Sequence, residues 1–115
     1  MKTELQIKEE RRQIIEWERS NRNAATRAIL GGICVYDKQV KGGCAVGRLM
    51  PDNRLEHRIA PVTALVDKDI DPILYLGIGF LQDLQGWHDN GYNFTPTGLT
   101  ENGMKRLDRI ESSYC

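Results

Sequence analysis

The sequence predicts a mainly α (α+β) fold, with four to five helices packed around a small β-hairpin. Apolar residues recur at helical spacing in several stretches. Helix-capping residues precede most of these stretches. Only a short stretch near residue 35 is rich in β-branched and aromatic residues. Since 115 residues with 40% hydrophobic content match the size of one folded unit, we expect a single domain over residues 1–115.

Two helices are predicted in the first thirty residues. Thr3 is placed to cap the first helix. After a polar break at 20–23, the stretch "AATRAIL" (24–30) shows helical spacing, and Gly31 and Gly32 would end that helix at Leu30. The first helix has a loose apolar face formed by Leu5, Ile7, Ile14, Ile15 and Trp17.

The predicted hairpin follows directly. "ICVYD" (33–37) is expected to form one strand, "KQVKGG" (38–43) the turn, and Cys44 to Val46 the return. A lone hairpin is marginal in water, so it must lie on helices. The stretch "DNRLEHRIA" (52–60) suits one or two helical turns that stop before Pro61.

The best helical pattern covers residues 71–90, which we expect to be the core element. Asp71 and Pro72 supply a cap and a proline at the first helical position, and Gly91 supplies the C-terminal cap. The apolar stripe of this helix comprises Leu76, Phe80, Leu81, Leu84 and Trp87 or His88.

A last helix is predicted after Thr100, which is placed as its cap. Leu99 and Met104 have the spacing of a hydrophobic staple. Leu107, Ile110 and Tyr114 are expected to point inward.

Composition and charge predict a cytoplasmic protein without a membrane span. The longest uncharged apolar stretch, 73–81, has nine residues and two glycines, and the charged start lacks a signal-peptide core. The three cysteines, Cys34, Cys44 and Cys115, are expected to be thiols. Net charge is +4 over residues 1–60 and −4 over residues 61–115. This asymmetry could attract an anion, let subunits meet, or be solvated surface.

The segment "GGCAVGRLMP" (42–51) gives the candidate site. If a helix began in "CAVGRLM", its free amides and the fork-shaped side chain of Arg48 could hold a phosphate. The alternative is structural: the glycines shape a tight turn and a close crossing. The candidate ligand-binding residues are Lys41, Gly42, Gly43, Arg48, Arg54, Tyr36, His88 and Asp89.

Metal and catalytic sites find less support in the residue pattern. Cys34 and Cys44, with His57 and His88 further on, are the residues weighed for zinc. The two cysteines are ten positions apart, which is wider than zinc sites use, so two buried thiols are the alternative. Cys44 with His57 or His88 and Asp89 could form a nucleophile, base and orienter, or "WHDNG" could simply end a helix. Aromatic residues are not interleaved with a basic stripe, as base-stacking proteins require. We therefore expect no metal, no cofactor and no nucleic-acid partner.

The order of three motifs suggests a family. "CVY", "GGCAVGRLMPD" and "FLQDLQGWHDN" resemble small proteins of bacteriophages and bacteria with the pattern CxY, CAVGxLxPD and FLxxLQxxHD, over residues 24–90. Arg48 stands where those relatives often have Cys or Ala, and Gly43 where Lys is common. The resemblance implies phage origin without an established activity. The matched positions are Cys34, Tyr36, Cys44, Gly47, Pro51, Asp52, Leu84, Gln85, His88 and Asp89.

Three functions are consistent with this sequence. The first is a non-enzymatic phage accessory protein in the host cytoplasm, which binds a host factor such as a defence protein or its anionic nucleotide signal. The second is a small enzyme acting through Cys44 or His88. The third is a structural or regulatory module that forms homo-oligomers. The expected partner is a host protein or a phosphorylated small molecule, and no membrane.

Overall fold

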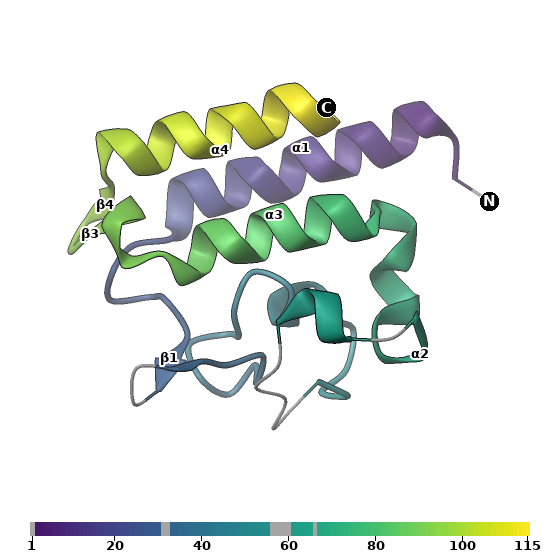
Figure 1. Ribbon diagram of the computed structural model, residues 1–115, viewed down its shortest axis with the longest axis horizontal. Coiled ribbons are helices and arrows are strands. Elements are labelled where there is room, and N and C mark those ends of the chain that lie inside the picture. Colours follow the sequence, from purple (N-terminus) through teal and green to yellow (C-terminus); the bar gives the residue numbers. More distant parts are fainter. Residues whose placement is uncertain (1, 31–32, 56–60, 66) are drawn as a thin grey trace.

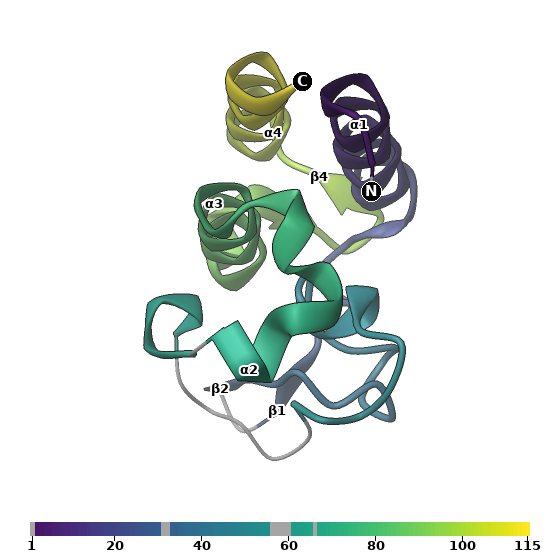
Figure 2. The same ribbon diagram turned by 90° about the vertical axis from the view of Figure 1, so that its right-hand side faces the viewer.

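The computed structural model describes residues 2–30, 33–55, 61–65 and 67–115, and it confirms the mainly helical α+β class. Three long helices, α1 (Glu4–Asn21), α3 (Ile78–Asp89) and α4 (Glu101–Tyr114), lie side by side as a bundle (Figure 1). α4 packs against both α1 and α3 and runs antiparallel to them. The segments between α1 and α3 lie against one side of this bundle (Figure 2).

The other elements are short. Two antiparallel pairs of two-residue strands are present: β1 (Ile29–Leu30) pairs with β2 (Ile33–Cys34), and β3 (Phe94–Thr95) pairs with β4 (Gly98–Leu99). In these pairs Ile29 lies opposite Cys34, and Phe94 lies opposite Leu99. The remaining elements are η1 (Gly47–Leu49), η2 (Val62–Ala64), α2 (Asp67–Ile70), η3 (Asp71–Leu76) and η4 (Gly91–Asn93), where η marks a 3-10 helix.

The start of α1 is as predicted. The Thr3 hydroxyl accepts a hydrogen bond from the Gln6 amide, and the Gln6 side chain accepts one from the Thr3 amide, which completes a capping box. The predicted apolar face holds at Ile15, which is fully buried. It fails at Leu5, which is 80% exposed, because the first turns of α1 extend past the end of α4 (Figure 1).

The helix predicted at 24–30 is wrong. Asn23 instead forms a turn in which its side-chain oxygen accepts hydrogen bonds from the amides of Ala25 and Thr26. The Ala24 amide donates to the Thr95 carbonyl, and the chain then enters β1. Bonds to a distant segment therefore replace the local helix that the alanine spacing favoured.

The predicted hairpin register is also wrong. β2 pairs with β1, which precedes it, and Cys44 to Val46 form no strand. The chain does return to this point, because the Cys44 amide donates to the Val35 carbonyl at 3.0 Å. The 3-10 turn η1 begins at Gly47, so the chain does not continue alongside residues 33–37 as a strand. Residues 52–55 show bends and a turn in place of the predicted helix, and the rest of that stretch lies outside the described residues.

The predicted core helix at 71–90 is divided in two. Gly77 adopts a φ of 96°, so η3 ends there and α3 begins. Pro72 does lie in the first turn of η3, as predicted. The end of α3 differs, since Asn90 forms the C-cap and Gly91 opens η4. The buried side chains of α3 are Phe80, Leu81, Leu84, Gln85, Trp87 and His88.

α4 confirms its predicted start and inner face. The Thr100 hydroxyl accepts a hydrogen bond from the Gly103 amide. Leu107 and Ile110 are buried, and Tyr114 contacts the Phe80 ring edge-on with ring centroids 5.6 Å apart. Met104, expected in a staple, is 38% exposed. None of the helices within the described residues is long and apolar enough to cross a membrane.

Candidate functional site

The segment around "KGGCAVGR" does not begin a helix, which corrects the expectation on which the phosphate site rested. Lys41, Gly42 and Gly43 have φ values of 53°, 81° and 87°, and η1 is a single three-residue turn. The amides that a phosphate would need are already used within the protein. Those of Gly43, Cys44 and Arg48 donate to the carbonyls of Val40, Val35 and Cys44, respectively.

The glycines of this segment let the backbone pack closely against Tyr36, which agrees with the alternative that they shape a tight turn and a close crossing. A Cβ on Gly47 would overlap the carbonyl oxygen of Tyr36, and one on Gly43 would lie 2.9 Å from the same atom. Tyr36 itself is only 5% exposed. This candidate ligand residue therefore lies in the core, where a ligand from solvent does not reach it.

His88 and Asp89 belong to a hydrogen-bonded network at the end of α3. The Ala28 amide approaches His88 Nε2 at 3.4 Å, so Nδ1 carries the proton and donates to Asp89 Oδ1 at 2.9 Å. Gln85 donates to the same carboxylate oxygen at 2.7 Å and accepts from the Val46 amide at 3.0 Å. Burial lowers the pKa of His88, and the bond to Asp89 opposes that effect. The network joins three segments of the chain and holds a neutral imidazole.

Cys44 lies beside this network but is not poised for chemistry. Its side chain is 1% exposed, and burial raises the pKa of the thiol to about 12. His88, its proposed base, is fully buried with both ring nitrogens engaged. An accessible thiolate and a base with a free nitrogen are what nucleophilic catalysis needs, so this geometry does not favour the enzyme alternative.

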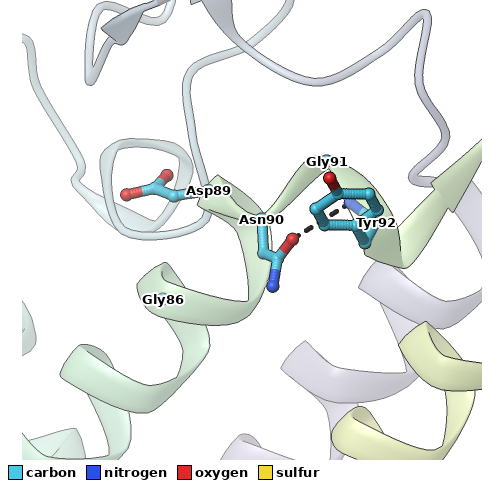
Figure 3. A pocket seen from close by; sticks show the side chains of 5 residues that line it. All are labelled: Gly86, Asp89, Asn90, Gly91 and Tyr92. Carbon is cyan, nitrogen blue, oxygen red and sulfur yellow. Dashed lines mark hydrogen bonds between the residues drawn. The ribbon is translucent and has the colours of Figure 1, made fainter.

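A shallow pocket of about 570 Å³ lies where α3 ends (Figure 3). It is lined by Gly86, Asp89, Asn90, Gly91 and Tyr92. The Asn90 side-chain oxygen accepts from the Tyr92 amide at 3.0 Å, and the side chains of Asp89 and Tyr92 point in different directions (Figure 3). The pocket thus offers no convergent set of polar groups for a ligand.

Arg48 is the predicted site residue with the most distinctive surroundings. Glu18 of α1 is fully buried, and Arg22 binds both of its carboxylate oxygens, at 2.7 and 3.0 Å. Arg48 Nε lies 3.6 Å from Glu18 Oε1, beyond hydrogen-bonding distance, and is buried without a hydrogen-bond partner among the described residues. The guanidinium carbon of Arg48 lies 3.7 Å from the centroid of the Trp17 ring.

A groove of about 380 Å³ opens beside this cluster. We call it the Arg48 groove; its walls come from α1, η1 and η3, and its lining residues are Glu10, Gln13, Ile14, Trp17, Arg48, Leu49 and Tyr75. Trp17 is 38% and Tyr75 42% exposed. Lys2 forms an ion pair with Glu10 and lies 4.9 Å from the Tyr75 ring centroid. The groove therefore combines two accessible aromatic side chains, an amide, the Arg48 cation and the Glu10 carboxylate, whose charge is paired with Lys2.

The structure does not bring the other predicted basic residues into this groove. Arg54 forms ion pairs with Asp52 and Asp71 on the surface. Lys41 and Gly42 are exposed. Trp17, Glu18 and Arg22 were missed as site residues; the four-residue spacing of Glu18 and Arg22 on one helix was the signal that could have indicated their pairing.

No group of three or more metal-binding side chains occurs in the parts of the chain that the structure describes. Of the residues weighed for a metal, His57 lies outside those parts. Comparisons with protein-family models, with curated proteins and with solved structures find no match.

Proposed function

We propose that this chain is a non-catalytic binding protein that holds the anionic group of a phosphorylated small molecule on Arg48, in the Arg48 groove. The observation that carries the proposal is the incomplete pairing of this arginine. Its neighbour Glu18 is already bound by Arg22 through both oxygens, and Arg48 Nε has no hydrogen bond within the described residues. The Nε atom itself is buried, so a bound anion would contact the part of the Arg48 side chain that remains accessible, which is 23% exposed, and would balance its charge.

The charges of this cluster support an anionic ligand. One carboxylate, Glu18, faces two guanidinium groups, so the cluster of three carries a net charge of +1. Burial lowers the pKa of Arg48, and nearby Arg22 adds to that effect, while Glu18 opposes it. An arginine nevertheless stays protonated at neutral pH. A partly desolvated cation of this kind gains more from an incoming anion than a fully solvated surface cation does.

The rest of the groove suits a ligand with a flat, partly apolar body. Trp17 and Tyr75 offer aromatic surface, Ile14 and Leu49 offer aliphatic surface, and Gln13 offers an amide. Its volume of about 380 Å³ lies at the lower end of the range for small-molecule sites. A nucleotide combines such a body with a phosphate, so we place the ligand in the nucleotide class.

The biological role follows from the resemblance of the motifs to small phage and bacterial proteins. We propose a phage-type accessory protein that works in the host cytoplasm by sequestering a nucleotide signal of host defence. Sequestration requires binding alone, which is consistent with the burial of Cys44 and His88. No observation on the described residues favours the oligomeric module over this role.

Calorimetric titration with nucleoside phosphates, cyclic dinucleotides and inorganic phosphate tests the proposal. We expect at least one nucleotide to bind, and Arg48→Gln to weaken binding by about tenfold or more, since bonds to charged groups are strong. Affinity should fall as salt is raised, because salt screens exposed charge. Arg54→Gln is the matched control, since it removes an arginine with ion-paired neighbours outside the groove. If no nucleotide binds, or both variants bind alike, the assignment of the ligand to Arg48 is wrong.

A further inference from the structure

Two arginines on α4 stand apart from the other arginines that the structure describes. Arg106 and Arg109 have no ion pair and no hydrogen bond within the described residues, whereas every other described arginine has at least one such partner. The two are one helical turn apart, so their side chains are neighbours on the helix surface. Two adjacent cations without a counter-charge repel each other, and an acidic group placed between them would relieve that repulsion.

The charges of α4 are divided between its two sides. On the side toward α1, Asp108 and Glu111 bind Arg19 at 2.9 and 2.8 Å. On the side toward α3, Arg106 and Arg109 line a groove of about 200 Å³. We call this the α4 basic groove; its other lining residues are Asp83, Trp87, Ile110 and Ser113.

The one carboxylate in this groove does not neutralise the arginines. Asp83 Oδ2 accepts a hydrogen bond from the Tyr114 hydroxyl at 2.6 Å, and no ion pair joins it to Arg106 or Arg109. Trp87 and Ile110 form an apolar floor, at 1% and 9% exposure. The groove therefore presents two guanidinium groups that have no partner in the described part of the chain, above a small apolar base and beside a serine hydroxyl.

We propose that the α4 basic groove docks an acidic helical segment of a partner protein, whose carboxylates are spaced one turn apart. That spacing matches the one-turn separation of Arg106 and Arg109, and each guanidinium can bind a carboxylate with two hydrogen bonds. This surface shares no residue with the Arg48 groove, so the inference is independent of the proposed nucleotide site.

Two other occupants fit the groove less well. A nucleic acid is bound by many cations along its backbone, whereas this groove has two arginines beside the carboxylate of Asp83. A second copy of this chain would have to offer free carboxylates on a long helix, but every carboxylate of α1 and α4 is already in an ion pair. Charge complementarity therefore favours an acidic segment of a different protein.

The test uses the full chain and a fluorescein-labelled, alanine-rich helical peptide with glutamates along one face, followed by fluorescence anisotropy at low salt. We expect the peptide to bind, and the Arg106→Gln/Arg109→Gln variant to lose about tenfold in affinity, because each exposed pair contributes about a factor of three to five. Lys41→Gln/Lys68→Gln is the matched control, since it removes two exposed positive charges elsewhere and should leave binding within about twofold.

Four outcomes of the binding assay would overturn the inference. They are no binding of the peptide, equal loss in the two double variants, equal binding of a peptide with glutamine in place of glutamate, and tighter binding of an oligothymidylate than of the peptide. Sedimentation equilibrium is run in parallel on the wild type and on Arg106→Gln/Arg109→Gln. A dimer that dissociates in the variant would show that a second copy covers the groove, and would overturn the inference as well.

Discussion

Gly47 lies directly against the backbone of Tyr36: a Cβ built on this glycine would be 2.8 Å from the Tyr36 carbonyl carbon and would overlap its oxygen. The contact brings η1 against the segment 35–37, which follows β2. It explains why the glycine-rich stretch cannot carry larger side chains at this position, and it does so without any ligand.

Replacing Gly47 by alanine should therefore destabilise the fold. Because the added Cβ would meet the backbone of Tyr36, which cannot move aside as a flexible side chain can, we expect Gly47→Ala to lower the free energy of unfolding by about 2–4 kcal/mol, at or above the usual cost of overpacking. Gly86→Ala is the control, since Gly86 lies within α3 and a Cβ there would meet nothing within 4 Å. That change should raise stability by about 0.5–1 kcal/mol through helix propensity. Urea unfolding measures both, and equal stabilities would refute the close contact.

The buried ion pair of Glu18 and Arg22 gives a second prediction. Arg22→Met would leave a fully buried carboxylate with only Arg48 nearby, so we expect a loss of about 3–5 kcal/mol. Adding Glu18→Gln to that variant should recover part of the loss, because the uncompensated charge is removed. Arg12→Met, which breaks the exposed pair with Glu9, should cost less than about 1 kcal/mol in the same assay. A loss for Arg22→Met as small as that for Arg12→Met would contradict the buried pair.

The three long helices could be predicted from the sequence because their signals are local. Thr3 and Thr100 cap helices through hydrogen bonds to residues three positions away, and the apolar period of α3 reports directly on its buried face. The stretch at 24–30 could not be predicted in this way. Its conformation depends on the hydrogen bond from the Ala24 amide to the Thr95 carbonyl. No local sequence pattern indicates a bond between residues about seventy positions apart.

Only part of the candidate site could be predicted, because its contacts also join residues that are far apart in the chain. Arg48 was identified as a donor, but its environment depends on Glu18 and Trp17, which are some thirty residues away in the chain and meet it only after folding. Trp17 was assigned to the apolar face of α1, yet it is 38% exposed and stacks on a cation. Tyr36, His88 and Asp89 were named as ligand contacts, whereas Tyr36 and His88 fill the core.

Thiol labelling should separate the cysteines. Cys44 is 1% exposed with a pKa raised to about 12 by burial, so almost no reactive thiolate forms at pH 8. Cys115 is exposed and should be alkylated first. Mass spectrometry of peptides after brief iodoacetamide treatment identifies the labelled residue. Rapid labelling of Cys44 in the native protein would show that the loop carrying it opens readily. Burial of Cys34 stays a prediction, because its side chain is not among those that the structure describes.

His88 should make stability depend on pH. Burial lowers the pKa of His88, so the unfolded chain binds more protons than the folded one just below the ordinary histidine value of about 6.5. The contribution of neutral His88 to the free energy of unfolding is therefore complete above that pH and is lost as the pH falls below it. The slope is at most about 1.4 kcal/mol per pH unit. Urea unfolding between pH 7.5 and 5.5 measures this slope. His88→Gln should flatten the profile, and an unchanged slope in that variant would assign the effect to other groups.

The central claim, that Arg48 and its groove hold an anionic ligand, is tested most directly by the two tryptophan indole N–H resonances in a ¹H–¹⁵N spectrum. Trp17 lines the groove beneath Arg48, while Trp87 is buried and donates its indole N–H to the Gly103 carbonyl at 3.0 Å. Titration with the tightest-binding nucleotide should shift the Trp17 signal, leave the Trp87 signal in place, and produce no shift of either in Arg48→Gln. A shift at Trp87 alone, or an equal response in Arg48→Gln, would place the ligand elsewhere and contradict the claim.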